Sequence, residues 1–215
     1  MPATTRSWLC ASVITFPPIS TDPERAGSGG CIGDIGTHAY HLACYVTGLR
    51  LEAVCAELTT FVAGRQLDDN AQIMLRFSGG ARGLLWASQV APGNENGLRL
   101  RVYGSAGGIE WKQENPNQLW HTPFAQPAQL ITRGGSGAGD SANRLSRLPP
   151  GHPEGYLEGF ANIYSEVAAA LQSLLDGTPL DEAVDFPTVD DGVRGVEFIE
   201  AAVASSNAGA TWVSL

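Results

Sequence analysis

The sequence of 215 residues has no apolar run approaching the roughly 18 residues that a membrane-spanning helix needs, so no membrane association is expected. Basic side chains are also in short supply: 13 lysines and arginines stand against 22 aspartates and glutamates, for a formal net charge of −9. Because an acidic protein repels phosphate backbones, nucleic acid is not expected as a partner either. Small neutral or cationic ligands remain compatible with this composition.

Cysteine is scarce, and its spacing does not favour redox or zinc chemistry. No Cys-x-x-Cys pair occurs, and reduced structural thiols are expected at all four positions, Cys10, Cys31, Cys44 and Cys55. The apolar stretch 8–16 resembles a secretory signal only weakly, because it has little basic charge before it and is followed by Pro17 and Pro18. A cytoplasmic location is therefore expected.

An apolar content of 43% and this length fit one globular domain. Residues 1–28 follow neither a period of 2 nor one of 3.6 and are interrupted by prolines, so we expect a poorly ordered lead-in. The domain proper is expected over residues 29–215. Its first element is a helix at about 35–47, with Asp34 as the N-cap and Gly48 just past the end.

From residue 51 the apolar period changes to two, which predicts five to seven strands between residues 51 and 132. The runs 71–77 and 98–103 alternate cleanly, and the glycine-containing turns 78–80 and 104–108 predict antiparallel hairpins. These strands are expected to form one open sheet with a polar face that is solvated or used for association.

Two helices are predicted after the strands. The glycine-rich and serine-rich stretch 134–152 predicts a long mobile loop, and apolar residues spaced by three and four then predict an amphipathic helix over 157–174 that ends near Gly177. A capping box at 188–191 begins the second helix, which runs to Gly209. The fold class is therefore α+β: an open mixed, mostly antiparallel sheet with helices packed on one face.

The densest polar cluster lies at residues 34–41. The spacing of Asp34 and His38 brings a carboxylate and an imidazole to one helix face, where the carboxylate can fix the imidazole tautomer for general acid or base catalysis. The structural alternative is that Asp34 only caps the helix and His38 is a satisfied side chain. A third possibility adds His41 to make a metal site, with a further ligand from His152 or Glu154.

Three further residues are candidates for substrate binding. His152 and Tyr156 lie on and just after the predicted loop, where their side chains could contact a substrate hydroxyl. Asn94 lies in a Pro-Gly-Asn-Glu-Asn-Gly connection that could bind the hydroxyls of a polyol. Helix capping by His152 and ordinary turn chemistry at Asn94 are the structural alternatives.

The segment 28–38, Ser-Gly-Gly-Cys-Ile-Gly-Asp-Ile-Gly-Thr-His, resembles a motif of a known family. The motif is the Gly-Gly-Gly-x-x-x-Asp-x-Gly-x-His segment of the glucose-fructose oxidoreductase, inositol dehydrogenase and rhizopine-catabolism (Gfo/Idh/MocA) family, and the match departs only at Ser28. Residues 22–25, 86–94 and 151–156 also resemble sugar-active members, so the resemblance covers about 22–215.

The resemblance implies that this chain is the second, substrate-binding and oligomerisation domain of such an enzyme. Members pass a hydride between a sugar or polyol carbon and NAD or NADP, using the Asp and His of the segment and a lysine from a Glu-Lys-Pro motif in the first domain. Asp34 and His38 match the first two residues. The lysine has no match, since the only lysine, Lys112, lies in a strand pattern.

A dinucleotide-binding turn is not found in the sequence. The spacing Gly27-x-Gly29-x-x-Ile32 fails at its last position, and the glycines at 135–139 have the wrong spacing and no helix after them. We therefore expect NAD or NADP to be held by a domain missing from this chain, with no cofactor-binding residue and no metal within it.

Three hypotheses follow. The first is a fragment of an NAD(P)-dependent sugar or polyol dehydrogenase that lacks its dinucleotide-binding domain, with Asp34 and His38 as catalytic residues and a homo-oligomer formed through the open sheet face. On its own such a chain is expected to be inactive. The second is a stand-alone, non-catalytic module that dimerises or binds sugar. The third is a metal-dependent enzyme resembling sugar isomerases.

Overall fold

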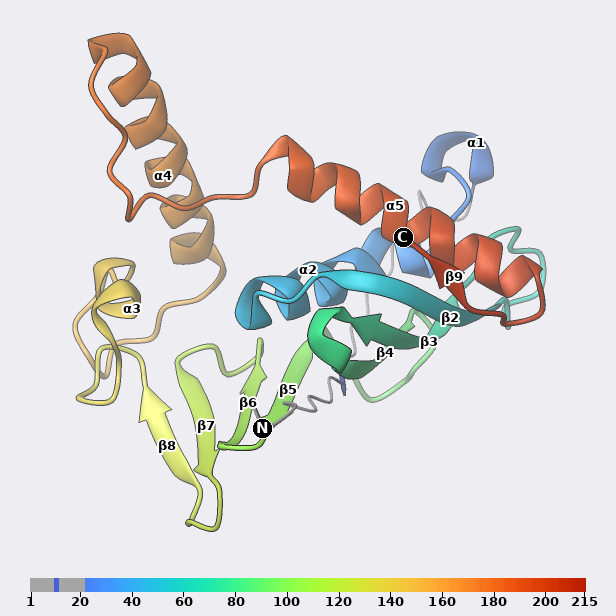
Figure 1. The fold of residues 1–215 in the computed structure, drawn as a ribbon, viewed down its shortest axis with the longest axis horizontal. Coiled ribbons are helices and arrows are strands. Elements are labelled where there is room, and N and C mark those ends of the chain that lie inside the picture. The colour runs from blue at the N-terminus through green and yellow to red at the C-terminus, as the bar shows by residue number, and fades with distance from the viewer. Residues whose placement is uncertain (1–9, 12–21) are drawn as a thin grey trace.

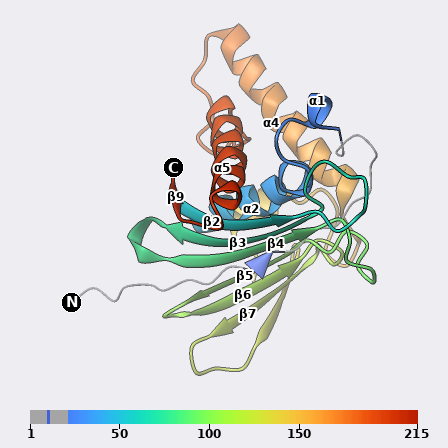
Figure 2. The same ribbon diagram turned by 90° about the vertical axis from the view of Figure 1, so that its right-hand side faces the viewer.

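The structure is a computed structural model that describes residues 10–11 and 22–215. Helices α2 and α5 lie over one face of a first sheet, and a second sheet lies on its other side (Figures 1 and 2). The first sheet has the order β1-β4-β3-β2-β9, with the bounds β1 Cys10–Ala11, β4 Arg82–Ser88, β3 Asn70–Phe77, β2 Leu51–Thr59 and β9 Val213–Ser214.

The first sheet forms because its strands alternate. In β3 the side chains of Ile73, Leu75 and Phe77 are buried while those of Gln72 and Arg76 are exposed, as the period of two predicts. Strands β2, β3 and β4 are antiparallel neighbours, whereas β1 pairs with β4 in parallel, which makes the sheet mixed.

The second sheet is an antiparallel meander in the order β5-β6-β7-β8, with the bounds Arg99–Gly104, Gly107–Lys112, Gln118–Pro123 and Gln129–Thr132. The predicted α+β class, the strand count between residues 51 and 132 and the two hairpins are confirmed. The structure differs in dividing the strands between two sheets. The irregular connection 89–98 separates β4 from β5, and β1 lies between these two strands instead (Figure 2).

The helices on the first sheet bury the main core. A short π-helical turn, η2 (Ile32–Gly36), continues into α2 (Thr37–Thr47), which ends at Gly48 with φ 66°. Helix α5 (Val189–Asn207) packs across β2, and its Phe198 ring stacks on Tyr40 of α2 with the centroids 4.5 Å apart. The helices predicted at 35–47 and from the 188–191 box are therefore confirmed.

Two helices lie away from this core. Helix α3 (Asp140–Arg144) and helix α4 (Tyr156–Asp176) lie toward the β8 edge of the second sheet, and α4 projects outward in Figure 1. Helix α4 ends at Gly177, as predicted. Within the described ranges, no helix has the length and apolar character that a bilayer crossing would need.

The predicted lead-in, residues 1–28, falls mostly outside the described residues. Its described parts are β1 and a short helix, α1 (Pro23–Ala26). Three of the four cysteines have described side chains, and Cys31, Cys44 and Cys55 are free thiols. Burial raises the pKa of the Cys31 thiol, as expected for a structural cysteine.

Candidate functional site

The glycine-rich segment before η2 is held by Asp68, which lies two residues before the start of β3. The main-chain N–H of Gly30 donates to Asp68 Oδ1 at 2.6 Å, and that of Ile32 donates to Oδ2 at 2.9 Å. Burial raises the pKa of the Asp68 carboxyl, and these two hydrogen bonds act in the opposite direction. The prediction that Asp34 is the N-cap is wrong, because the helix begins two residues earlier and Asp68 supplies the capping carboxylate.

The glycines are required by close approach of the chain. A Cβ at Gly30 would lie 2.3 Å from the main-chain oxygen of Asp68, and a Cβ at Gly29 would lie 2.9 Å from Ile199 of α5. The N–H groups of Gly30 and Ile32, which a phosphate would need at a helix start, are already bound to the Asp68 carboxylate. The segment is therefore built to pack against the protein rather than to bind a dinucleotide.

Asp34 lies in the middle of η2 and lines a cavity of about 590 Å³. The cavity lies between η2, the segment after α1 and helix α5, which contributes Val196, Ile199 and Glu200. Asp34 is half-buried, and its Oδ2 accepts a hydrogen bond from Gln89 Nε2 at 3.2 Å. Beside it, a Cβ at Gly33 would meet no atom within 4 Å, so the cavity is open at this point.

His38 follows one helical turn after Asp34, in the first turn of α2, and its side chain is exposed. No hydrogen bond joins the imidazole to Asp34 in the part of the chain that the structure describes. Asp34 and His38 therefore lie on neighbouring turns, as predicted, but their side chains are not hydrogen-bonded to each other.

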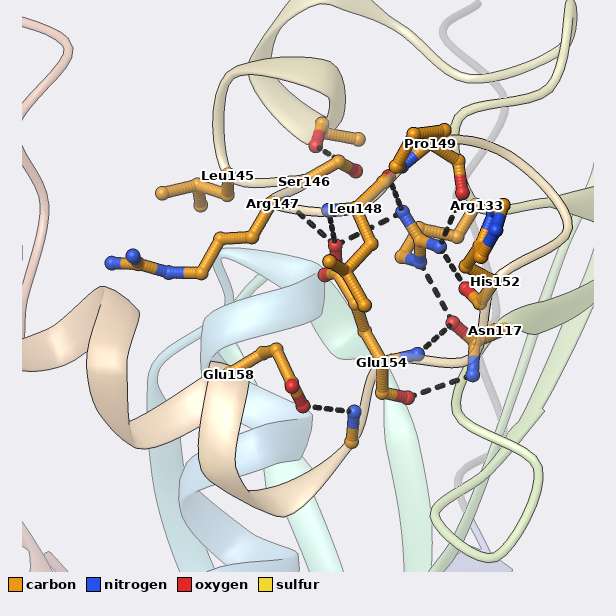
Figure 3. Close-up of polar contacts among 12 residues, drawn as sticks. Asn117, Arg133, Leu145, Ser146, Arg147, Leu148, Pro149, His152, Glu154 and Glu158 are labelled. Atoms are coloured by element: carbon orange, nitrogen blue, oxygen red, sulfur yellow. Dashed lines mark hydrogen bonds and ion pairs between the residues drawn. The ribbon is translucent and has the colours of Figure 1, made fainter.

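Of the predicted site residues only Asp34 lines this cavity, and the lining contains neither His38 nor the three substrate-binding candidates. Asn94 is exposed and donates to the main-chain oxygen of Ala91 in its own turn. Tyr156 is 76% exposed and packs on Phe160 at the start of α4. His152 is exposed, and its main-chain oxygen accepts from Arg133 (Figure 3). In Figure 1, α3 and α4 lie across the molecule from α1.

The stretch 134–152, predicted to be a long mobile loop, contains helix α3, and polar contacts hold it near His152. Arg133 makes an ion pair with the buried carboxylate of Glu154 at 3.1 Å and donates to the main-chain oxygens of Leu148 and Pro149 (Figure 3). Asn117 binds both the N–H and the C=O of Glu154. Its composition predicted mobility because the arginine and carboxylate partners lie outside the glycine-rich stretch.

The metal hypothesis gains no support from the described residues, which contain no group of three or more potential His, Cys, Asp or Glu ligands. Asp34 is bound by Gln89, and Glu154 is bound by Arg133 and main-chain N–H groups. His152 and Glu154, which were predicted as possible further ligands, therefore belong to the hydrogen-bond network of Arg133 and not to the surroundings of Asp34.

Among the described residues, helix α4 makes its hydrogen bonds to neighbouring segments through its polar face. Glu166 accepts two hydrogen bonds from Arg144, at 2.8 and 2.9 Å, and Asn162 accepts one from Arg147. The opposite face is apolar and exposed, with Leu174 at 78% and Leu175 at 80%. This apolar stripe consists of Tyr156, Leu157, Phe160, Ile163, Tyr164, Leu171, Leu174 and Leu175.

Comparison with known proteins identifies relatives over nearly the whole chain. A family model described as the GFO/IDH/MocA C-terminal domain matches residues 4–110, so the match extends into the segment expected to be a lead-in. An uncharacterized oxidoreductase, YfiI, of Bacillus subtilis (strain 168) is 34% identical over 196 residues, covering 89% of this chain and 50% of the relative. Levoglucosan dehydrogenase of Pseudarthrobacter phenanthrenivorans is 30% identical, covering 92% of this chain and 55% of the relative.

Solved structures agree with these matches. An oxidoreductase from Sinorhizobium meliloti is 50% identical with a TM-score of 0.86, covering 98% of this chain and 57% of that one. An inositol dehydrogenase homolog complexed with NAD+ from Azotobacter vinelandii is 31% identical with a TM-score of 0.91, covering 99% of this chain and 58% of that one. The chain spans about half the length of the curated relatives it matches. By motif, fold and relatives together, the chain belongs to the Gfo/Idh/MocA oxidoreductase family and corresponds to its C-terminal domain.

Proposed function

We propose that this chain is the substrate-binding and oligomerisation part of an NAD(P)-dependent sugar or polyol dehydrogenase. The observation that carries the proposal is the position of Asp34, which the family motif marks and which lines the 590 Å³ cavity. A 32% identical relative was solved with NADH and myo-inositol, which supports a polyol as the class of substrate. The remaining half of the relatives' length leaves room for a separate dinucleotide-binding domain.

The residues of this chain are suited to the proton step of alcohol oxidation. When a C–H hydride leaves, the hydroxyl proton must be accepted, and a neutral imidazole at His38 can accept it. The carboxylate of Asp34, one turn away, stabilises the imidazolium that forms. Asp68 accepts the N–H groups of Gly30 and Ile32 in the glycine segment, which supports a hydride acceptor held by another domain.

The apolar stripe of α4 supports the presence of that domain. Eight exposed large apolar side chains on one helix face form a larger apolar patch than soluble proteins usually leave in contact with water, and such patches mark interaction sites. We assign it to contact with the dinucleotide-binding domain, because the chain's own loop already occupies the polar face. The open face of the second sheet, where Tyr103 and Trp120 are each 45% exposed, is then available for homo-oligomer formation.

The catalytic assignment is tested in a completed enzyme. The chain is joined to the part of the inositol dehydrogenase homolog from Azotobacter vinelandii, solved with NAD+, that this chain does not cover. Sugar and polyol oxidation is then followed by NADH absorbance. His38→Ala should lower turnover by about 10²–10⁴-fold. His121→Ala, in strand β7 of the second sheet, is the matched control and should leave turnover unchanged. Wild-type turnover in His38→Ala would overturn the assignment.

The cofactor assignment is tested on the 215-residue chain by itself. Calorimetric titration with NADH and NADPH should show no binding up to millimolar ligand, and binding should appear in the joined protein. Micromolar binding to the isolated chain would mean that the cofactor site lies within it, contrary to the proposal.

A further inference from the structure

Two strands of the first sheet end together beside Gln89, the residue that contacts the Asp34 carboxylate. Strands β3 and β4 are antiparallel, with Asn70 opposite Ser88, so the start of β3 and the end of β4 meet at one sheet edge. Asp68 and Asp69 precede β3 there, and Gln89 follows β4. The main-chain N–H of Gln89 donates to the main-chain oxygen of Asp69 at 2.8 Å, which fixes these two chain segments to each other.

Both the main chain and the side chain of Asp34 are held from this sheet edge. The N–H of Asp34 donates to the oxygen of Gly30 at 2.9 Å, and Gly30 is itself bound by Asp68. The carboxylate accepts from the amide of Gln89. Gln89 is only 2% exposed and is not part of the cavity lining, so it contacts Asp34 from the protein interior.

We propose that Gln89 is a positioning residue that holds the Asp34 carboxylate in one rotamer. A hydrogen bond to an ionised carboxylate is stronger than one between neutral groups, and a buried amide fixed at its own main chain has little freedom to follow a moving partner. Gln89 holds Oδ2 of a side chain that lines the cavity. His38, which the motif pairs with Asp34, follows one turn later along the helix and is exposed. The effect of Gln89 on turnover rests on the proposed function, whereas its effect on the Asp34 side-chain rotamer does not.

The rotamer is measured on the 215-residue chain by three-bond NMR couplings to the Asp34 carboxyl carbon, which report the χ1 populations. Gln89→Met retains a flexible unbranched side chain of similar length but removes the donor. We expect one rotamer in the wild type and averaging among rotamers in the variant. Gln72→Met, on the exposed face of β3, is the control and should leave the couplings unchanged. A single Asp34 rotamer in a folded Gln89→Met chain would overturn the proposal.

The catalytic consequence is measured in the enzyme completed with a dinucleotide-binding half. Gln89→Met should lower kcat by about tenfold to hundredfold while KM for the sugar stays within about twofold, since losing a bond to a charged group affects the transition state. An inactive wild-type enzyme with a normal rotamer result refutes the proposed function and leaves the positioning role supported. A lost rotamer preference with unchanged kcat shows that Asp34 orientation has no part in the reaction.

Discussion

Replacing Asp68 with asparagine should destabilise the whole chain, because this one side chain holds the start of η2. Its two carboxylate oxygens accept the N–H groups of Gly30 and Ile32 at 2.6 and 2.9 Å. Asparagine keeps one acceptor oxygen and turns an NH2 group toward the other N–H. One charged hydrogen bond worth about 1.5–3 kcal/mol is lost, and a buried N–H is left unpaired at a cost of about 1–3 kcal/mol.

Relief of the buried charge offsets part of this loss, since burial raises the pKa of Asp68 and its ionisation is therefore unfavourable in the folded protein. The net expected loss is about 2–4 kcal/mol. Urea unfolding followed by tryptophan fluorescence measures it as a lower midpoint at an unchanged slope. Asp176→Asn, at the exposed end of α4, is the control and should change the free energy of unfolding by less than about 0.5 kcal/mol. A midpoint for Asp68→Asn equal to that of the control would refute the reasoning.

The pH dependence of the same variant has a definite sign. Because the folded pKa of Asp68 lies above its ordinary value of 3.8, the folded state binds more protons than the unfolded state between those two values. The stability that Asp68 contributes therefore falls as the pH rises through this window. The difference in unfolding free energy between wild type and Asp68→Asn should narrow as the pH rises above 3.8, and a widening would contradict this direction.

Two further predictions concern other elements. The main-chain N–H of Thr188 and the Arg194 guanidinium lower the pKa of Asp191 to about 2, so its stabilisation is present above 3.8 and is lost as the pH falls toward 2. Asp191→Ala should lower Tm at pH 7, and the difference from wild type should disappear near pH 2; a difference that persists there would argue against the assignment. Arg133→Ala should accelerate amide hydrogen exchange over residues 145–154, whereas the exposed Arg50→Ala should not, and equal exchange in both variants would mean that Arg133 does not anchor the loop.

The sequence predicted those helices and strands that are marked by apolar periodicity or by capping residues within the element itself. Alternation in 71–77 identified β3, because burial of one face of a strand requires a period of two. The apolar spacing after 157 together with Gly177 identified α4, although its apolar face is exposed in this chain. The box at 188–191 marked the start of α5. Asp34 was misassigned as an N-cap because the residue that performs this role, Asp68, is 34 positions further along the chain.

The same limit applies to the loop before α4. Its glycine and serine content predicted mobility, yet Arg133 donates to the main-chain oxygen of Leu148, 15 positions away. Within the stretch, Arg144 and Arg147 bind carboxylates 22 and 7 positions away. Nothing in a local window pairs a given arginine with a given carboxylate. The fold decides this pairing, since Glu154 and Glu166 become acceptors only when the second sheet and α4 are in place.

At the candidate site, the motif provides the proposed catalytic residues, and the ends of two strands provide the groups that hold one of them in place. The motif contains Asp34 and His38 on successive helical turns. Their proximity could be predicted from the sequence because they are four positions apart. The groups that hold Asp34 come from the ends of β3 and β4, which meet only when the sheet has formed. The motif can therefore be present in a chain whose sheet edge is altered, and such a chain should fold with Asp34 in place but without a fixed carboxylate. Gln89→Met produces this state by a single substitution, so it separates what the motif contributes from what the sheet contributes.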